Sequence, residues 1–172
     1  MRYLILLVTL VTPLTTQGEI SNTLPYESFA STLIERGMTN NGDHSKALEG
    51  AKRCMAIFQI AAAYDLISSD DGSQILNNAY KGIVSVAFII NTSIMDYADG
   101  SYTVPMMIED QKEWQKSSTE IAHGYINWLE SNNESPESAG EYHPFKIELN
   151  QCITLGTSIR NAQIRTSSDQ SQ

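Results

Sequence analysis

Apolar side chains recur at steps of three and four residues along most of this 172-residue chain, which is the spacing of one face of an α-helix. The clearest run lies between Ala51 and Leu66, where Met55, Phe58 and Ala62 continue a seven-residue repeat. Segments rich in Gly, Pro, Asn, Asp and Ser separate five such runs. The pattern predicts a helix in each run: residues 25–37, 45–66, 105–131 and 144–165, and one more between 72 and 99.

Several of these helices carry a start signal. Pro25, Pro105 and Pro144 each stand at the beginning of a predicted helix, where the missing N–H of proline is no loss. Asp43 or Ser45 can cap the second helix by accepting a hydrogen bond from one of its free N–H groups.

The segment 83–90 leaves its secondary structure open. It is rich in β-branched residues and is compatible with a strand. Helical spacing on both sides, and the absence of turn residues within it, favour a buried helix instead.

The arrangement of these segments predicts one all-α domain over residues 19–165. Four long helices and a short leading helix, joined by short connections, are typical of an up-down helical bundle. In such a bundle the second and last helices lie side by side. Lys52 and Arg53 are expected on the solvent side of the second helix.

The chain begins with the features of a signal peptide. Arg2 is followed by an apolar stretch from Tyr3 to Leu14, and small residues near Gly18 suit a signal peptidase. Residues 1–18 are therefore expected to be removed, leaving a periplasmic or secreted protein. No later apolar stretch reaches the length of a membrane span. Residues 166–172 are polar and are predicted to form a disordered tail.

The predicted export bears on the two cysteines, Cys54 and Cys152, because it determines whether they are expected to form a disulfide. An even number of cysteines in an oxidising compartment usually indicates a disulfide. Each cysteine lies near the middle of its helix, at matching heights if the two helices are antiparallel. Closing a loop of about 100 residues would stabilise the fold by roughly 4–5 kcal/mol in the chain-entropy account. Two separate buried thiols are the alternative.

The formal net charge of −9 disfavours some partners and leaves others open. A nucleic acid or an anionic membrane surface is not expected, because neither is matched by a basic patch in this chain. A basic protein partner is compatible with the acidic surface.

Candidate catalytic chemistry is sparse, and no cofactor is expected. The motifs of common hydrolases and nucleotide-binding proteins are absent from the sequence. Glu120 and His123 form half of the carboxylate–histidine pattern that helical bundles use for paired metal ions. His44 and His143 lack a glutamate three residues earlier, so a metal site is not expected. A surface pair on one helix is the favoured interpretation, and the protein is predicted not to be an enzyme.

Aromatic residues offer candidate anchors for a partner. Tyr64, Tyr97, Trp114 and Trp128 lie towards helix ends or the edges of the apolar stripes. Tyrosine and tryptophan are favoured in binding surfaces, although they are also common at the edge of a core.

The segments 53–55, 63–64 and 151–153 resemble those of periplasmic immunity proteins that neutralise type VI amidase toxins, which are small exported helical proteins with a cysteine on each of two helices. The resemblance implies a non-enzymatic inhibitor or immunity protein for a toxin or hydrolase, and it assigns no residue roles. Two alternatives stay open: an exported enzyme of unfamiliar type using Glu120 and His123, and a structural or phage-encoded exported protein.

Overall fold

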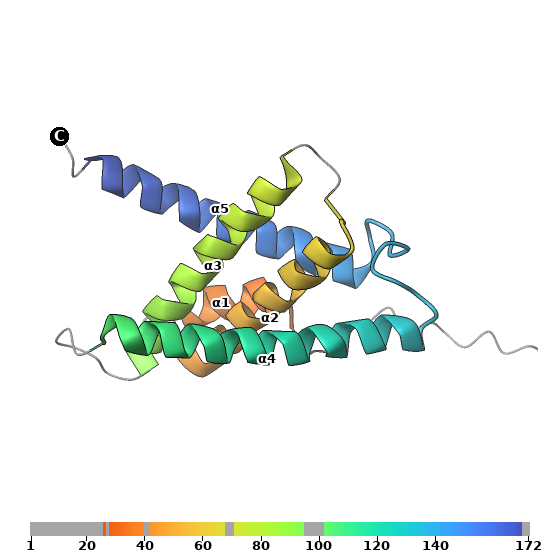
Figure 1. Cartoon of the computed structure of the whole chain (residues 1–172), viewed down its shortest axis with the longest axis horizontal. Helices are drawn as coiled ribbons and strands as arrows, with labels where there is room; N and C mark the ends of the chain where they lie inside the picture. The colour runs from red at the N-terminus through yellow and green to blue at the C-terminus, as the bar shows by residue number, and fades with distance from the viewer. Residues whose placement is uncertain (1–25, 27, 40–41, 68–70, 95–101, 170–172) are drawn as a thin grey trace, which may run out of the picture.

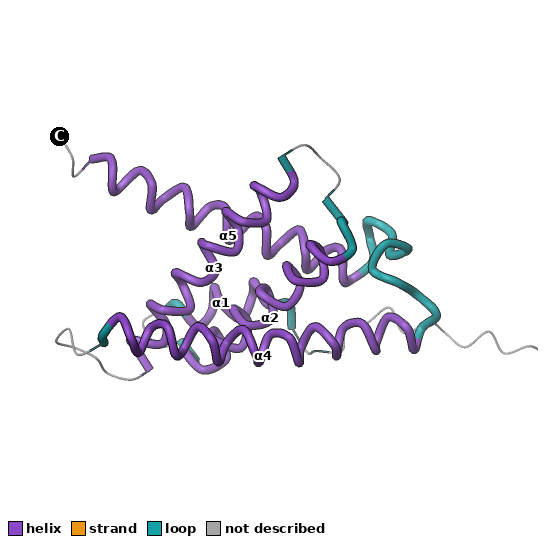
Figure 2. The backbone as a smooth tube through the Cα atoms, viewed as in Figure 1, coloured by secondary structure: helices purple, strands orange, loops and turns teal. Residues whose placement is uncertain are grey.

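A computed structural model describes residues 26, 28–39, 42–67, 71–94 and 102–169 (Figures 1 and 2). All regular elements in this part of the chain are helices, so the predicted all-α bundle is confirmed. Residues 83–90 are helical, as the flanking spacing favoured. The helices are α1 (Ala30–Gly37), α2 (His44–Ala63), α3 (Gly72–Ile94), α4 (Val104–Ser131) and α5 (Pro144–Asp169).

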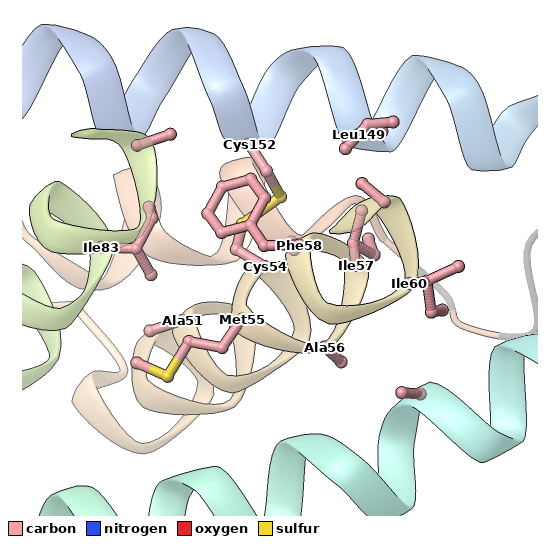
Figure 3. Packing of buried hydrophobic residues seen from close by; sticks show 14 of the residues in the cluster. Ala51, Cys54, Met55, Ala56, Ile57, Phe58, Ile60, Ile83, Leu149 and Cys152 are labelled. Carbon is pink, nitrogen blue, oxygen red and sulfur yellow. A yellow bond between two sulfur atoms is a disulfide. The ribbon is translucent and has the colours of Figure 1, made fainter. Parts of the chain in front are cut away.

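Helix α2 is the centre of the fold, and the other four helices pack around it (Figure 1). Small residues on α2 allow this close surround. Gly50 is one example, because a Cβ there would lie 2.6 Å from the carbonyl oxygen of Ala30 in α1. Figure 3 shows the apolar side chains of α2 directed towards its neighbours, among them Met55, Ile57 and Phe58. Most positions of α2 are consequently buried.

Helices α3 and α5 run across each other and make the most extensive contact between any two helices in the described chain (Figure 1). Glycines permit this crossing. A Cβ on Gly82 would lie 1.9 Å from the carbonyl oxygen of Gly156, and a Cβ on Gly156 would lie 2.3 Å from that of Ala79. Helices α2 and α5 were expected to lie side by side. They do touch, but their backbones approach each other over a shorter length than those of α3 and α5 do. Helix α5 thus packs mainly on α3, with the closest approach at Gly82 and Gly156.

Most predicted helix starts agree with the structure to within a few residues, and the first helix is the exception. Helix α1 begins at Ala30 rather than at Pro25, which lies outside the described residues. Its first N–H, on Ala30, donates to the carboxylate of Glu148 in α5 at 2.9 Å. A tertiary contact thus supplies the hydrogen-bond acceptor for the first N–H group of α1. Helix α2 has Asp43 as its N-cap, accepting from the N–H of Lys46 at 3.1 Å.

Two helix ends differ from the prediction. Helix α2 ends at Ala63 rather than Leu66, because Asp65 adopts a left-handed backbone conformation with φ of 47°. Helix α5 continues to Asp169, so residues 166–169, predicted to be part of a disordered tail, are helical. No helix in the described ranges is both long and apolar enough to cross a membrane.

Candidate functional site

A disulfide joins α2 to α5 at the centre of the molecule. Cys54 and Cys152 are bonded, with their Cα atoms 5.5 Å apart, and this confirms the predicted pair. Both residues are fully buried, and Phe58 and Leu149 lie beside them (Figure 3). The two sulfur atoms are bonded to each other within the core, so neither is available as a nucleophile.

Arg53, the residue before Cys54, is buried and not on the solvent side of α2 as predicted, whereas Lys52 is half-buried. Arg53 is 1% exposed, because its side chain is covered by the Tyr26 ring and by its contacts with Tyr125 and Glu148. Its Nη2 atom lies 2.5 Å from Oε1 of Glu148 on α5, whose side chain is also fully buried. A buried ion pair thus stands next to the disulfide.

Hydrogen bonds from three other parts of the chain complete this pair. The hydroxyl of Tyr125, on α4, donates to Oε2 of Glu148 at 2.7 Å. Arg53 donates from Nε to the Tyr125 hydroxyl at 3.3 Å and from Nη1 to the carbonyl oxygen of Ser28 at 2.7 Å. With the Ala30 N–H, the network joins α1, α2, α4 and α5. Buried charges are stable only when their polar atoms are paired and hydrogen-bonded in this way.

Burial raises the pKa of both acidic groups in this network. It raises the pKa of Glu148, by more than the nearby Arg53 guanidinium and the hydrogen bonds lower it. Burial, followed by the negative charge of Glu148, raises the pKa of Tyr125 well above its ordinary value. Tyr125 therefore keeps its proton and acts as the donor to Glu148. Because both carboxylate oxygens already accept hydrogen bonds, the geometry gives the network a structural role.

Tyr26 covers this network from the side of α1. Its ring lies 4.1 Å from Cζ of Arg53 in a cation–π contact, and its centroid lies 5.2 Å from that of Tyr125. Tyr26 and Arg53 also line a polar hollow of about 580 Å³ between α1 and the first half of α2. The rim of this hollow mixes charges of both signs, including Arg36 and Glu49, so it has no clear preference for one ligand charge.

A second polar cluster joins α3 to the start of α4. Asn91 donates from Nδ2 to Oδ2 of Asp110 at 2.8 Å, and the hydroxyl of Tyr102 donates to the same oxygen. Phe88 packs against Trp114 beside it, with ring centroids 4.9 Å apart. Side chains therefore connect α3 and α4.

The connection between α4 and α5 is held by a histidine. Nε2 of His143 lies 2.9 Å from Oε2 of Glu134, while the N–H of Phe145 donates to Nδ1 of His143 at 3.2 Å. Because Nδ1 accepts from the Phe145 N–H, Nε2 is the ring nitrogen that carries a proton, and it lies within ion-pair distance of Glu134. The ring also packs against Trp128, with centroids 5.3 Å apart.

An apolar groove lies between the C-terminal half of α2 and the N-terminal half of α3. We call it the α2–α3 groove, and it has a volume of about 400 Å³. Its lining includes Phe58, Ala62, Asp65, Leu76, Asn77 and Tyr80.

The three predicted aromatic anchors that the structure describes lie on different parts of the molecule. Tyr64 is the C-cap of α2 and is half-buried, and Trp128 packs on the α4–α5 connection. Trp114 is only 2% exposed and packs on Phe88. The contact with α3 makes the Trp114 indole part of the core, and a binding role for this residue stays a prediction. Tyr97 lies outside the described residues.

Glu120 and His123 lie exposed on α4, and neither forms an ion pair with another described residue. Within the part of the chain that the structure describes, no three side chains of the metal-ligating types come together.

Sequence reasoning missed both the buried network and the groove. Glu148 stands four residues before Cys152 and Arg53 directly precedes Cys54, so a charged residue one turn or less from each cysteine was the available signal. No known protein family, curated protein or solved structure matches this chain.

Proposed function

We propose that this chain is an exported, non-enzymatic binding protein whose partner is a basic protein. The observation that carries the proposal is the buried disulfide between Cys54 and Cys152. Stable disulfides belong to oxidising compartments such as the periplasm or the cell exterior. The bond therefore supports the same compartment as the predicted signal peptide at residues 1–18.

The use of the buried polar groups supports a binding role over a catalytic one. Arg53, Glu148 and Tyr125 hold four parts of the chain together, and their hydrogen bonds are taken by one another and by the backbone. A rigid scaffold of this kind reduces the entropy that is lost when a partner binds.

The charge balance supports a basic partner. The sequence has 20 acids and 11 bases, and complementary charge accelerates association and selects between partners. Inhibition of a toxin or hydrolase, as in the immunity proteins that the sequence resembles, is the sharper form of the proposal.

Export is tested by producing the full chain in a bacterial host and analysing the periplasmic fraction by mass spectrometry. We expect the mass of a chain cleaved after Gly18, with no alkylated cysteine unless the protein is first reduced and unfolded. A full-length cytosolic protein with two reactive thiols would contradict the proposal.

Binding is tested by immobilising the oxidised mature protein and passing over it an envelope extract of the organism that produces it. We expect one basic protein at stoichiometric ratio, whose own activity decreases when the purified chain is added. Retention of no such protein would count against a binding role. A catalytic activity of the purified chain that disappears in His123→Ala would favour an enzyme instead.

A further inference from the structure

The α2–α3 groove is an apolar hollow that opens to the outside of the molecule. Phe58, which is 4% exposed, contributes to its apolar lining, together with Leu76 and Tyr80. Ala62 and Asn77 also line it and are exposed, so the groove is open to the outside. Its volume of about 400 Å³ is within the range of about 300–1,000 Å³ that is usual for ligand sites.

Asp65 brings a negative charge to this apolar groove. It is exposed, it forms no ion pair with any described residue, and the described lining contains no Lys or Arg. An unpaired carboxylate beside an apolar hollow is complementary to a ligand that combines an apolar group with a cation.

The position of Asp65 is also unfavourable for the stability of α2. The residue follows the C-cap in a Schellman-type turn, in which the N–H of Leu66 donates to the carbonyl oxygen of Ala61 at 3.0 Å. Glycine normally occupies this left-handed position, and φ at Asp65 is 47°. A negative charge at the C-terminus of a helix is unfavourable as well. A residue type that is unfavourable both for a left-handed backbone and for the C-terminus of a helix is typical of a functional position when it lies at the edge of a hollow.

We propose that the α2–α3 groove binds a protein segment in which a large apolar side chain stands next to a lysine or arginine. The apolar side chain occupies the space between Phe58, Leu76 and Tyr80, and the cation pairs with Asp65. The side chain of Asn77, which also lines the groove, is available to the backbone of the segment. This inference rests on the proposed function and names the surface that it uses.

The observations favour a protein segment over other occupants. The open rim admits a side chain that is attached to a larger body, which an enclosed cavity would not do. A second copy of this chain is disfavoured, because each copy carries a net charge of −9 and the two would repel.

The probe is a random peptide library displayed on phage and selected on the oxidised mature protein. We expect enriched sequences in which an aromatic or large aliphatic residue adjoins Lys or Arg. One enriched sequence is then synthesised and titrated by calorimetry against the wild type, Ala62→Trp, Asp65→Asn and Glu120→Gln.

Ala62→Trp fills the groove and should weaken binding by at least about tenfold. Asp65→Asn keeps the left-handed turn but removes the charge, and it should weaken binding by about five- to tenfold at low salt and less at high salt. Glu120→Gln removes an exposed acid on α4, outside the groove, and should change the affinity by less than about twofold. Circular dichroism and an intact disulfide establish that each variant is folded. If Ala62→Trp does not fold, the comparison of Asp65→Asn with the wild type still tests the inference.

The inference is overturned if no peptide is enriched, if the enriched peptides are acidic, or if they bind all variants equally. It is also overturned if the partner retained from the envelope extract binds Asp65→Asn and Ala62→Trp as tightly as the wild type. That last outcome would leave the proposed function standing, whereas the absence of any partner would count against the function itself.

Discussion

At the scale of single residues, the buried pair of Arg53 and Glu148 is costly to form. Removing two charges from water costs several kcal/mol each, and attraction between them recovers this only when the other polar atoms are also bonded. Here Tyr125, Ala30 and Ser28 supply the additional bonds. The pair therefore fixes which residues meet rather than adding much net stability.

The raised pKa of Glu148 predicts how its contribution depends on pH. A folded protein whose carboxyl has a pKa above the ordinary 4.5 binds a proton more readily than the unfolded chain does. The stability from this group is therefore complete below about pH 4.5 and is lost as the pH rises through the raised pKa. In Glu148→Gln nothing titrates at this position, so the advantage of the wild type over the variant should shrink as the pH rises.

Urea unfolding of both proteins between about pH 4 and pH 8 measures this difference. An advantage that grows with pH would contradict the prediction, since it would mean that Arg53 holds the pKa of Glu148 below its ordinary value. Arg53→Met serves as a second variant. It leaves the Glu148 carboxylate buried without its partner and should cost about 3–5 kcal/mol where that carboxylate is ionised.

Asp65 leads to a prediction in the opposite direction. Asp65→Gly removes both the left-handed strain and the charge at the end of α2, and it should raise the free energy of unfolding by roughly 1 kcal/mol. Asp65→Asn should gain only a few tenths of a kcal/mol, because it removes the charge alone. Thermal unfolding compares the three proteins, and a loss of stability in Asp65→Gly would show that the carboxylate has a structural role.

At the scale of the helices, the packing of α3 against α5 depends on the absence of two side chains. Gly82 and Gly156 lie where the two backbones touch, so neither position has room for a methyl group. Glycine lowers the stability of an isolated helix, but here it allows the two helices to pack closely. The crossing therefore depends on residues that local helix propensity would disfavour.

Gly82→Ala and Gly156→Ala should each destabilise the fold by about 2 kcal/mol or more, because the new Cβ meets rigid backbone. Gly124→Ala is the matched control on α4. Its Cβ would meet only the Tyr26 hydroxyl at 3.6 Å, so the variant should be more stable by up to about 1 kcal/mol. Chemical denaturation gives the three values, and equal effects at all three glycines would contradict the described crossing.

At the scale of the whole molecule, the disulfide joins the central helix to the last one. The two cysteines are 98 residues apart in the sequence, so the bond constrains the unfolded chain over more than half of its length. Because both residues are fully buried, a reductant reaches the bond only when the molecule opens.

Replacing both Cys54 and Cys152 with alanine should lower the free energy of unfolding by about 4–5 kcal/mol if the chain-entropy account holds. In the wild type, dithiothreitol should leave the bond intact until a denaturant is added. Alkylation followed by mass spectrometry distinguishes the two states. Rapid reduction of the folded protein would place the bond at the surface and contradict the structure.

The sequence by itself determined the helices of this protein, because each depends on periodicity and end signals within a few neighbouring residues. It also indicated the cysteine pair, since only two cysteines were available. The start of α1 was not predictable in this way, because the Ala30 N–H is satisfied by Glu148, 118 residues away.

Only the tertiary structure decided the burial of Arg53 and Trp114, the crossing at Gly82 and Gly156, and the groove beside Asp65. An arginine next to a cysteine has the same local pattern whether that face of the helix meets water or another helix. Which of the two it meets depends on how four other helices are placed around α2, and contacts between residues far apart in the chain determine that placement.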